Sequence, residues 1–183
     1  AIKTAAWLGA PVETSSEALH LLTRIPGRAE KIDAGQDFLA IVDYAHTPDS
    51  LLALYGAYAK RRKICVLGNT GGGRDTWKRP LMGQIADEHC DEVILANEDP
   101  YDENPQTIVD AMAAGMKRTP RIIMNRREAI HTALSLARPG DAVLITGKGT
   151  DPFIMEANDT KTPWSDAQVV REELEKLNTG AVS

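Results

Sequence analysis

Four polar or glycine-rich segments directly follow predicted β-strands, and they hold most of the side chains that could do chemistry. They are the segments 44–50, 68–75, 97–105 and 147–151. Loops of this kind gather at the carboxyl edge of a parallel sheet, where ligands bind. We therefore expect one shared binding face. The alternative is that these are ordinary strand–helix loops, which are often polar and rich in glycine.

The glycine-rich segment 68–73 has the spacing of a P-loop, but its continuation does not fit one. Arg74 and Asp75 stand where a P-loop needs Lys and then Ser or Thr. We therefore do not expect it to hold the β- and γ-phosphates of ATP by itself, and it also lacks the spacing of a dinucleotide fingerprint. Two interpretations stay open: a flexible backbone that brings Arg74, Lys78 and Arg79 to an anion, or a turn with solvated charges.

The histidines and the acidic run are weaker signals. His46 lies between a strand and a capped helix, where a histidine is more often a hydrogen-bonded loop residue than a catalyst. His89 and Cys90 have no metal-ligand spacing to a second pair, so we expect no zinc site. The acidic run 98–103 is either a solvated loop or part of a pocket that selects a cationic group.

Composition places the chain among globular proteins and excludes wholesale disorder, with 43% hydrophobic and 26% charged residues in 183. A net charge of −5 disfavours nucleic acid as a partner, and the apolar runs are too short to cross a membrane. With no initiator Met and no leader, we expect a cytoplasmic protein and an excised piece of it. The two cysteines make no disulfide framework. Cys65 is predicted to be a small core residue, which fits a reducing compartment.

Periodicity indicates two parts. Helical spacing at 2–8 and 16–22 gives way, after Pro26-Gly27, to short β-rich runs that alternate with amphipathic helices. Helix N-termini are indicated at Thr47-Pro48, Asn104-Pro105, Asn125 and Ser165. The predicted strands are 29–33, 38–43, 63–67, 92–96, 121–124 and 142–146. The fold class is therefore α/β, a mainly parallel sheet of about six strands with helices on both faces, preceded by a short helical tail.

These segments, in this order, resemble the C-terminal domain of the Mur ligases, in particular of the members that add the third amino acid of the peptidoglycan stem peptide. Two strings are highly specific: Asp-Tyr-Ala-His-Thr-Pro at 43–48 and Lys-Arg-Pro-Leu-Met-Gly at 78–83. Shorter matches lie at 26–30, 73–75 and 147–149. The resemblance implies that residues 1–25 are the tail of a central ATPase domain and that 26–183 are a Rossmann-like C-terminal domain.

The resemblance implies an ATP-dependent ligase of peptidoglycan precursor synthesis in the cytoplasm. ATP would phosphorylate the terminal carboxylate of UDP-MurNAc-L-Ala-D-Glu, and the amine of the incoming amino acid would attack the acyl phosphate. ATP and Mg²⁺ would be held mainly by the upstream domain. We therefore expect neither a catalytic residue nor a metal ligand in this chain, and by itself the chain is expected to be inactive and to bind ATP weakly at most.

The family's motifs also imply roles for single residues. Asp43, Tyr44 and His46 are implied to meet the ribose and base of the nucleotide, and Arg28 and Lys78 are implied as further nucleotide or interdomain contacts. Arg74 is implied to grip the carboxylate of the amino acid, because a guanidinium suits bidentate binding. The same amino-acid pocket is implied to be lined by Glu98, Asp99, Tyr101, Gly147 and Asp151.

The sequence departs from the members that add diaminopimelate in two places. Tyr101 stands where they have Arg, and Thr150-Asp151 stands where they have His-Glu. Tyr101 offers one hydrogen bond but no positive charge for a distal carboxylate. The acidic residues nearby favour a free ammonium. We therefore favour a diamine amino acid such as lysine, or ornithine, over meso-diaminopimelate.

Three other functions compete with this interpretation. A folylpolyglutamate- or cyanophycin-type ligase would share the fold and differ upstream. A non-catalytic binding module would have kept the fold and lost the reaction, although Asp43, His46, Arg74 and Lys148 are all present. A dinucleotide-dependent oxidoreductase is disfavoured because no Gly-x-Gly-x-x-Gly follows the first strand.

Overall fold

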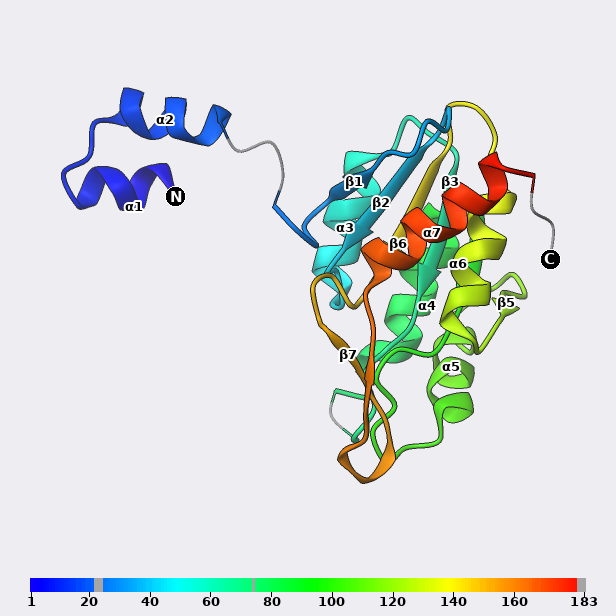
Figure 1. Cartoon of the computed structure of the whole chain (residues 1–183). Coiled ribbons are helices and arrows are strands. Elements are labelled where there is room, and N and C mark those ends of the chain that lie inside the picture. Colours follow the sequence, from blue (N-terminus) through cyan, green and yellow to red (C-terminus); the bar gives the residue numbers. More distant parts are fainter. Residues whose placement is uncertain (22–24, 74, 181–183) are drawn as a thin grey trace.

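A computed structural model describes residues 1–21, 25–73 and 75–180. The first part is a pair of helices, α1 (Ile2–Trp7) and α2 (Val12–His20), which contact each other and bury none of their residues. They lie apart from the sheet in Figure 1. Helix α2 begins four residues before the predicted start, because Pro11 takes the extended N-cap position. The end of the predicted helix, Leu22, lies outside the described residues.

The rest of the chain is built on a six-stranded sheet, as predicted. Its spatial order is β1 (Glu30–Ile32), β2 (Leu39–Asp43), β6 (Ala142–Thr146), β3 (Lys63–Leu67), β4 (Glu92–Leu95) and β5 (Arg121–Ile122). Strand β1 is antiparallel to β2, and the other neighbours are parallel. All loops that follow the parallel strands therefore leave from one edge of the sheet.

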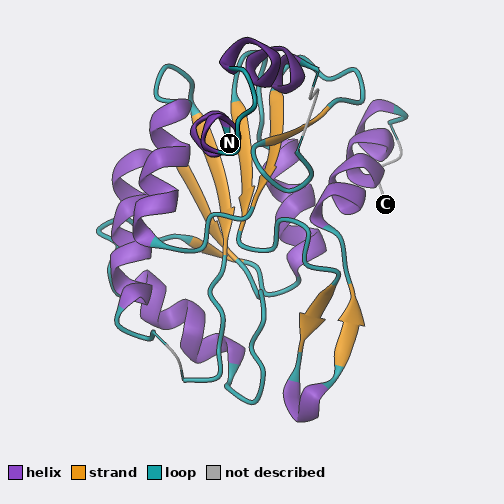
Figure 2. Cartoon of the chain, turned by 90° about the vertical axis from the view of Figure 1, so that its left-hand side faces the viewer, coloured by secondary structure: helices purple, strands orange, loops and turns teal. Residues whose placement is uncertain are grey.

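Helices cover both faces of this sheet (Figure 2). One face carries α3 (Pro48–Ala57), α4 (Lys78–His89) and α5 (Pro105–Ala113), and the other carries α6 (Arg126–Ser135) and α7 (Asp166–Asn178). The sheet residues alternate between the two cores: Ile41 packs with the first group of helices and Val42 with the second. This alternation is the period of two that a strand imposes on its side chains. Strands covered on both faces, such as β3 and β6, are therefore buried and largely apolar along their whole length.

The predicted helix starts are confirmed by their caps. The side chains of Asn104, Asn125 and Ser165 each accept a hydrogen bond from a backbone N–H of the first helical turn. A complete capping box occurs at Thr47: the Thr47 hydroxyl accepts from the Ser50 N–H, and the Ser50 hydroxyl accepts from the Thr47 N–H. The cap and the proline after it fix the start of α3 directly behind His46.

The cysteine prediction needs correction. Cys65 is a buried core residue, as expected, but it forms a disulfide with Cys90. Cys65 lies on β3, and Cys90 is the C-cap of α4, the helix that follows β3 in the chain. Because α4 packs back along its own sheet, the two sulfur atoms meet although 25 positions separate them. The bond thus ties α4 to the centre of the sheet.

One element was not predicted. Strands β7 (Phe153–Met155) and β8 (Lys161–Pro163) form an antiparallel hairpin, with the 3-10 turn η1 (Ala157–Asp159) at its tip. The hairpin extends beyond the carboxyl edge of the main sheet (Figures 1 and 2). Within the described ranges, none of the helices combines the length and the apolar character that a membrane crossing requires.

Candidate functional site

A polar cavity of about 440 Å³ lies at the carboxyl edge of the sheet. Residues from all four predicted loops line it, so the structure brings these loops together as expected. Two of the lining residues, Thr70 and Asp75, were not predicted; both belong to the glycine-rich segment. The lining residues are Tyr44, His46, Thr70, Asp75, Lys78, Asp99, Tyr101 and Asp151.

The loop after β2 presents a small aromatic stack. The Arg28 guanidinium carbon lies 4.5 Å from the centre of the Tyr44 ring, and the His46 ring meets the same tyrosine edge-on at 4.6 Å. His46 Nδ1 lies 2.7 Å from the Tyr44 carbonyl oxygen. Burial, together with the nearby Asp151 carboxylate, raises the pKa of Tyr44, so its hydroxyl stays protonated at neutral pH.

The Asp43 carboxylate accepts hydrogen bonds from the backbone on both sides of this aromatic cluster. One carboxylate oxygen accepts the Ala29 N–H at 2.6 Å, and the other accepts the Ala45 N–H at 2.8 Å. Ala29 has a φ of 44°, which is unusual for a residue other than glycine. Asp43 therefore holds the strained turn that carries Arg28 against the loop that carries Tyr44.

Asp99 is engaged in a buried ion pair. Both of its carboxylate oxygens lie 2.7 Å from the Lys148 ammonium, and one of them also accepts the Met155 N–H at 2.8 Å. Lys148 is 1% exposed. The pair fastens three elements to one another: the loop after β4, the loop after β6 and hairpin strand β7. Lys148 was not predicted as a site residue, because Gly-Lys-Gly after a strand is a weak signal.

Glu98 and Gly147 belong to two of these loops and pack directly against each other. Gly147 has a φ of 108°, and a Cβ atom there would lie 2.2 Å from Glu98 Oε2. Thr70 donates a hydrogen bond to Glu98 Oε1, whereas Oε2 is buried and has no partner among the described residues. Burial raises the pKa of Glu98, against the opposing effect of the Arg126 charge. Glycine at 147 is thus required by close approach, and Glu98 does not line the cavity itself.

The glycine-rich loop is held by an ion pair behind it. Arg79 is 2% exposed, and its two terminal nitrogens donate to Glu103 at 2.6 and 2.8 Å. The Glu103 carboxylate also accepts the Gly73 N–H at 3.3 Å. The Arg79 hydrogen bonds lower the pKa of Glu103. Arg79 is therefore committed to the fold rather than to a ligand, and Arg74 lies outside the described residues.

The described residues do not fit a cradle for a metal ion or for a triphosphate. No group of three or more His, Cys, Asp or Glu side chains in the described ranges is arranged to hold a metal. The loop 68–73 leads into Arg74 and Asp75 instead of the P-loop residues.

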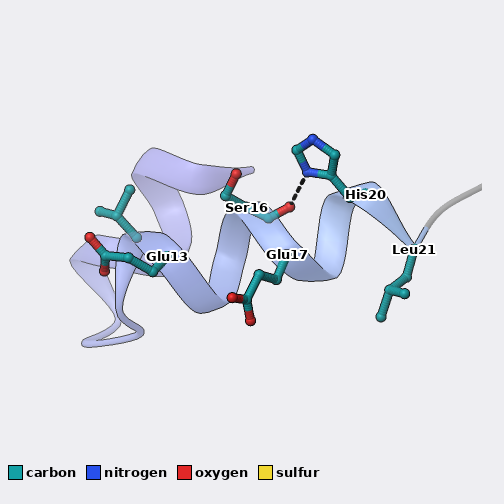
Figure 3. A pocket seen from close by; sticks show the side chains of 6 residues that line it. Glu13, Ser16, Glu17, His20 and Leu21 are labelled. Atoms are coloured by element: carbon teal, nitrogen blue, oxygen red, sulfur yellow. Dashed lines mark hydrogen bonds between the residues drawn. The ribbon is translucent and has the colours of Figure 1, made fainter.

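A wider hollow of about 760 Å³ lies on the helical pair, far from these loops in the chain. It is lined by α2 and Leu21 alone, including Glu13, Ser16 and His20. Figure 3 shows the His20 ring turned back onto the Ser16 carbonyl, at 2.8 Å. A hollow built on one helix has no opposing wall, so it lacks the convergent groups of a small-molecule site.

Comparison with known proteins places the chain in a family. Residues 27–149 match the family model described as Mur ligase, glutamate ligase domain, which covers more than half of the chain. The chain belongs to the Mur ligase family. The matched region contains all four cavity loops up to Gly149 and excludes the β7–β8 hairpin.

Individual relatives are more specific. The chain is 44% identical over 157 residues to a UDP-N-acetylmuramoyl-L-alanyl-D-glutamate–2,6-diaminopimelate ligase of Syntrophomonas wolfei, covering 79% of this chain and 32% of that protein. It is 40% identical over 182 residues to a UDP-N-acetylmuramyl-tripeptide synthetase of a Roseiflexus species, covering 94% and 35%. The chain thus spans about a third of the length of the curated relatives it matches.

Solved structures agree on the fold. A structure of a UDP-N-acetylmuramoyl-L-alanyl-D-glutamate–2,6-diaminopimelate ligase superposes with a TM-score of 0.77 at 31% identity, covering 97% of this chain and 37% of that one. A folylpolyglutamate synthase of Mycobacterium tuberculosis superposes with a TM-score of 0.57 at 20% identity, covering 97% of this chain and 38% of that one. The second likeness shows a shared fold alone.

Proposed function

We propose that this chain is the amino-acid-delivering domain of an ATP-dependent ligase that adds the third residue to UDP-MurNAc-L-Ala-D-Glu. The observation that carries the proposal is the cavity at the carboxyl edge, which residues from all four family loops line. Relatives that share about 40% of the residues are named for this reaction. Residues 1–25 would be the tail of the preceding ATPase domain, and 26–183 the C-terminal domain.

In this reaction the domain would position the incoming amino acid rather than make or break bonds itself. A carboxylate is a poor acyl donor, so ATP converts it into an acyl phosphate, whose phosphate leaves when an amine attacks. The amine must be held at the acyl carbon in the correct direction, and orientation of this kind supplies much of a rate enhancement. Mg²⁺ and the triphosphate would be bound by the preceding domain, since the described residues do not fit them.

Within the cavity we assign two zones. Tyr44 and His46, with Arg28 stacked on the tyrosine, present flat surfaces for the nucleotide base and ribose, and Asp43 holds that arrangement. Tyr101 and Asp151 line the zone for the amino acid. We give Glu98 and Gly147, which pack against each other, a supporting role in this zone. Asp99 fixes the surrounding loops through Lys148, and Arg74 would meet the carboxylate of the amino acid.

We favour a diamine amino acid such as lysine or ornithine over meso-diaminopimelate. Tyr101 lines the cavity without a charge, and its backbone N–H is fixed by the Met155 carbonyl at 3.0 Å. Asp75 and Asp151 are the lining carboxylates that Lys148 does not hold tightly, since Asp151 lies 3.8 Å from the Lys148 ammonium. They suit an ammonium group. Because the curated relatives include diaminopimelate ligases, the preference between these amino acids has to be decided by kinetic measurement.

The test is an amino-acid panel with the full-length protein that contains this chain, supplied with ATP, Mg²⁺ and UDP-MurNAc-L-Ala-D-Glu. We expect ATP hydrolysis coupled to amide formation, and a larger kcat/KM for L-lysine or L-ornithine than for meso-diaminopimelate. Absence of product with every amino acid would overturn the ligase assignment. A clear preference for diaminopimelate would overturn only the choice of amino acid.

The isolated 183-residue chain supplies a second test. We expect it to form no product and to bind ATP weakly at most, because the groups that hold the phosphates are proposed to lie in the preceding domain. Titration calorimetry with ATP measures this directly. Tight binding by the isolated chain would show that the nucleotide site is contained in this domain.

A further inference from the structure

One cation at the cavity has no partner among the residues that the structure describes. Lys78 is the first residue of α4, it lines the cavity and it is 9% exposed. The described residues give its ammonium neither a hydrogen bond nor an ion pair, in contrast to Lys148, which binds both oxygens of Asp99. The residue is buried, but its ammonium keeps contact with solvent at the cavity, so an anion there would meet an unpaired positive charge.

The position of Lys78 is fixed by its neighbours. Its own N–H donates to the Asp75 carbonyl at 3.1 Å, and the next residue, Arg79, is clamped to Glu103. The first turn of α4 is therefore held in place, and Lys78 has little freedom to turn away from the cavity.

The charges around Lys78 select the kind of anion. Asp99 is neutralised by Lys148, which leaves Asp75 and Asp151 as the other charged lining residues that are described. One positive and two negative charges are the complement of a diamine amino acid, which carries one carboxylate and two ammonium groups. A triphosphate would bring several negative charges toward those two carboxylates.

We infer that Lys78 binds the carboxylate of the incoming amino acid, opposite the carboxylates of Asp75 and Asp151. This inference rests on the proposed ligase function and adds to it a second cation on the amino-acid carboxylate, beside Arg74. It removes Lys78 from the nucleotide contacts that the family resemblance implies.

The experiment compares Lys78→Met with wild type in the full-length protein. The matched control is Lys60→Met, because Lys60 is an exposed lysine outside the cavity. A charge-assisted hydrogen bond supports a loss of about tenfold to a hundredfold. We expect the KM for the amino acid to rise by that factor in Lys78→Met and the KM for ATP to change less than about twofold. Lys60→Met should leave both unchanged.

A second substrate shows which group Lys78 meets. Replacing L-lysine by L-lysinamide removes the carboxylate charge, so the penalty for the amide should be clearly smaller in Lys78→Met than in wild type. If Lys78→Met also loses stability, Lys78→Arg serves as the second variant. It keeps the positive charge, so it should recover most of the affinity for the amino acid. An unchanged amino-acid KM, a rise confined to ATP, or an equal amide penalty in both proteins would overturn the inference. Wild-type activity in the same assays tests the ligase function separately.

Discussion

Two buried cationic regions of this molecule differ in how completely their charges are matched. Arg126 donates two hydrogen bonds to Asp166, at 2.8 and 2.7 Å, and a third to the Thr146 carbonyl at 2.8 Å. Trp164 donates to the same Asp166 carboxylate. Lys78, at the cavity, has no such partner among the described residues. The first charge is matched within the protein, whereas the second has no partner among the described residues.

The difference separates what holds the fold from what is offered to a substrate. The Arg126–Asp166 pair joins the start of α6 to the start of α7 and is essentially unexposed. A saturated buried pair of this kind fixes the elements around it. A buried charge left unmatched is a mark of a functional site. Substitution of a group that holds the fold should lower stability, whereas substitution of a group offered to a substrate should not.

The largest effect is expected at the saturated pair. Arg126→Met leaves the Asp166 carboxylate buried with only Trp164 as donor, so the free energy of unfolding should fall by about 3–5 kcal/mol. Denaturant unfolding of the 183-residue chain measures it. Adding Asp166→Leu to Arg126→Met should recover much of the loss. A fall below about 1 kcal/mol in the single variant would show that the pair does not hold the two helices.

The Cys65–Cys90 disulfide is also expected to stabilise the fold. It closes a loop of 25 positions, so reduction should lower the free energy of unfolding by about 3 kcal/mol. Denaturant unfolding with and without dithiothreitol measures the difference. The variant Cys65→Ala/Cys90→Ala serves as the control, since the reductant should not affect it. If the reductant leaves the native chain unchanged, the two thiols are not bonded in solution.

The two cavity lysines should differ in stability. Lys148→Met leaves the buried Asp99 carboxylate with the Met155 N–H but without its ammonium partner. We therefore expect the free energy of unfolding to fall by about 2 kcal/mol. Lys78→Met removes no hydrogen bond or ion pair given by the described residues, so the free energy of unfolding should change by less than about 1 kcal/mol. Parallel denaturant curves for the two variants measure the contrast. Equal losses would mean that Lys78 has a partner in the folded chain.

The smallest effect concerns Glu98 and depends on pH. Burial raises the pKa of Glu98 in the folded chain, so its protonated form contributes stability that is fully present below the unfolded pKa. That stability is lost as pH rises through the folded pKa. Glu98→Gln should therefore gain in Tm over wild type as pH rises above the ordinary glutamate range. Glu175→Gln, at an exposed position, is the control, and a flat difference for Glu98→Gln would contradict the prediction.

Local sequence pattern accounted for much of the fold. Strands at 63–67 and 142–146 were predicted to the residue, because continuous Val, Ile and Leu runs mark strands buried on both faces. Caps at Thr47 and Asn104 were found because each side chain bonds within its own turn. The β7–β8 hairpin was missed, since its short strands are largely exposed and include Pro163.

The site was predictable in outline but not in its internal pairing. The loops could be expected to meet because parallel strands end at one edge. The ion pair of Lys148 with Asp99 depends on packing between residues 49 positions apart, so the sequence around Lys148 does not reveal it. The Cys65–Cys90 bond is another contact that depends on where α4 lies over the sheet. Contacts of this kind follow from the fold and cannot be read from a local pattern.

The central claim is that the cavity at the carboxyl edge holds the incoming amino acid, with Tyr101 facing the end of its side chain. The most direct measurement compares Tyr101→Arg with wild type in the full-length protein, using meso-diaminopimelate and L-lysine as competing substrates. We predict that the ratio of kcat/KM for diaminopimelate over lysine rises by about tenfold or more, because a guanidinium pairs with the distal carboxylate. An unchanged ratio in a stable, active variant would contradict the claim.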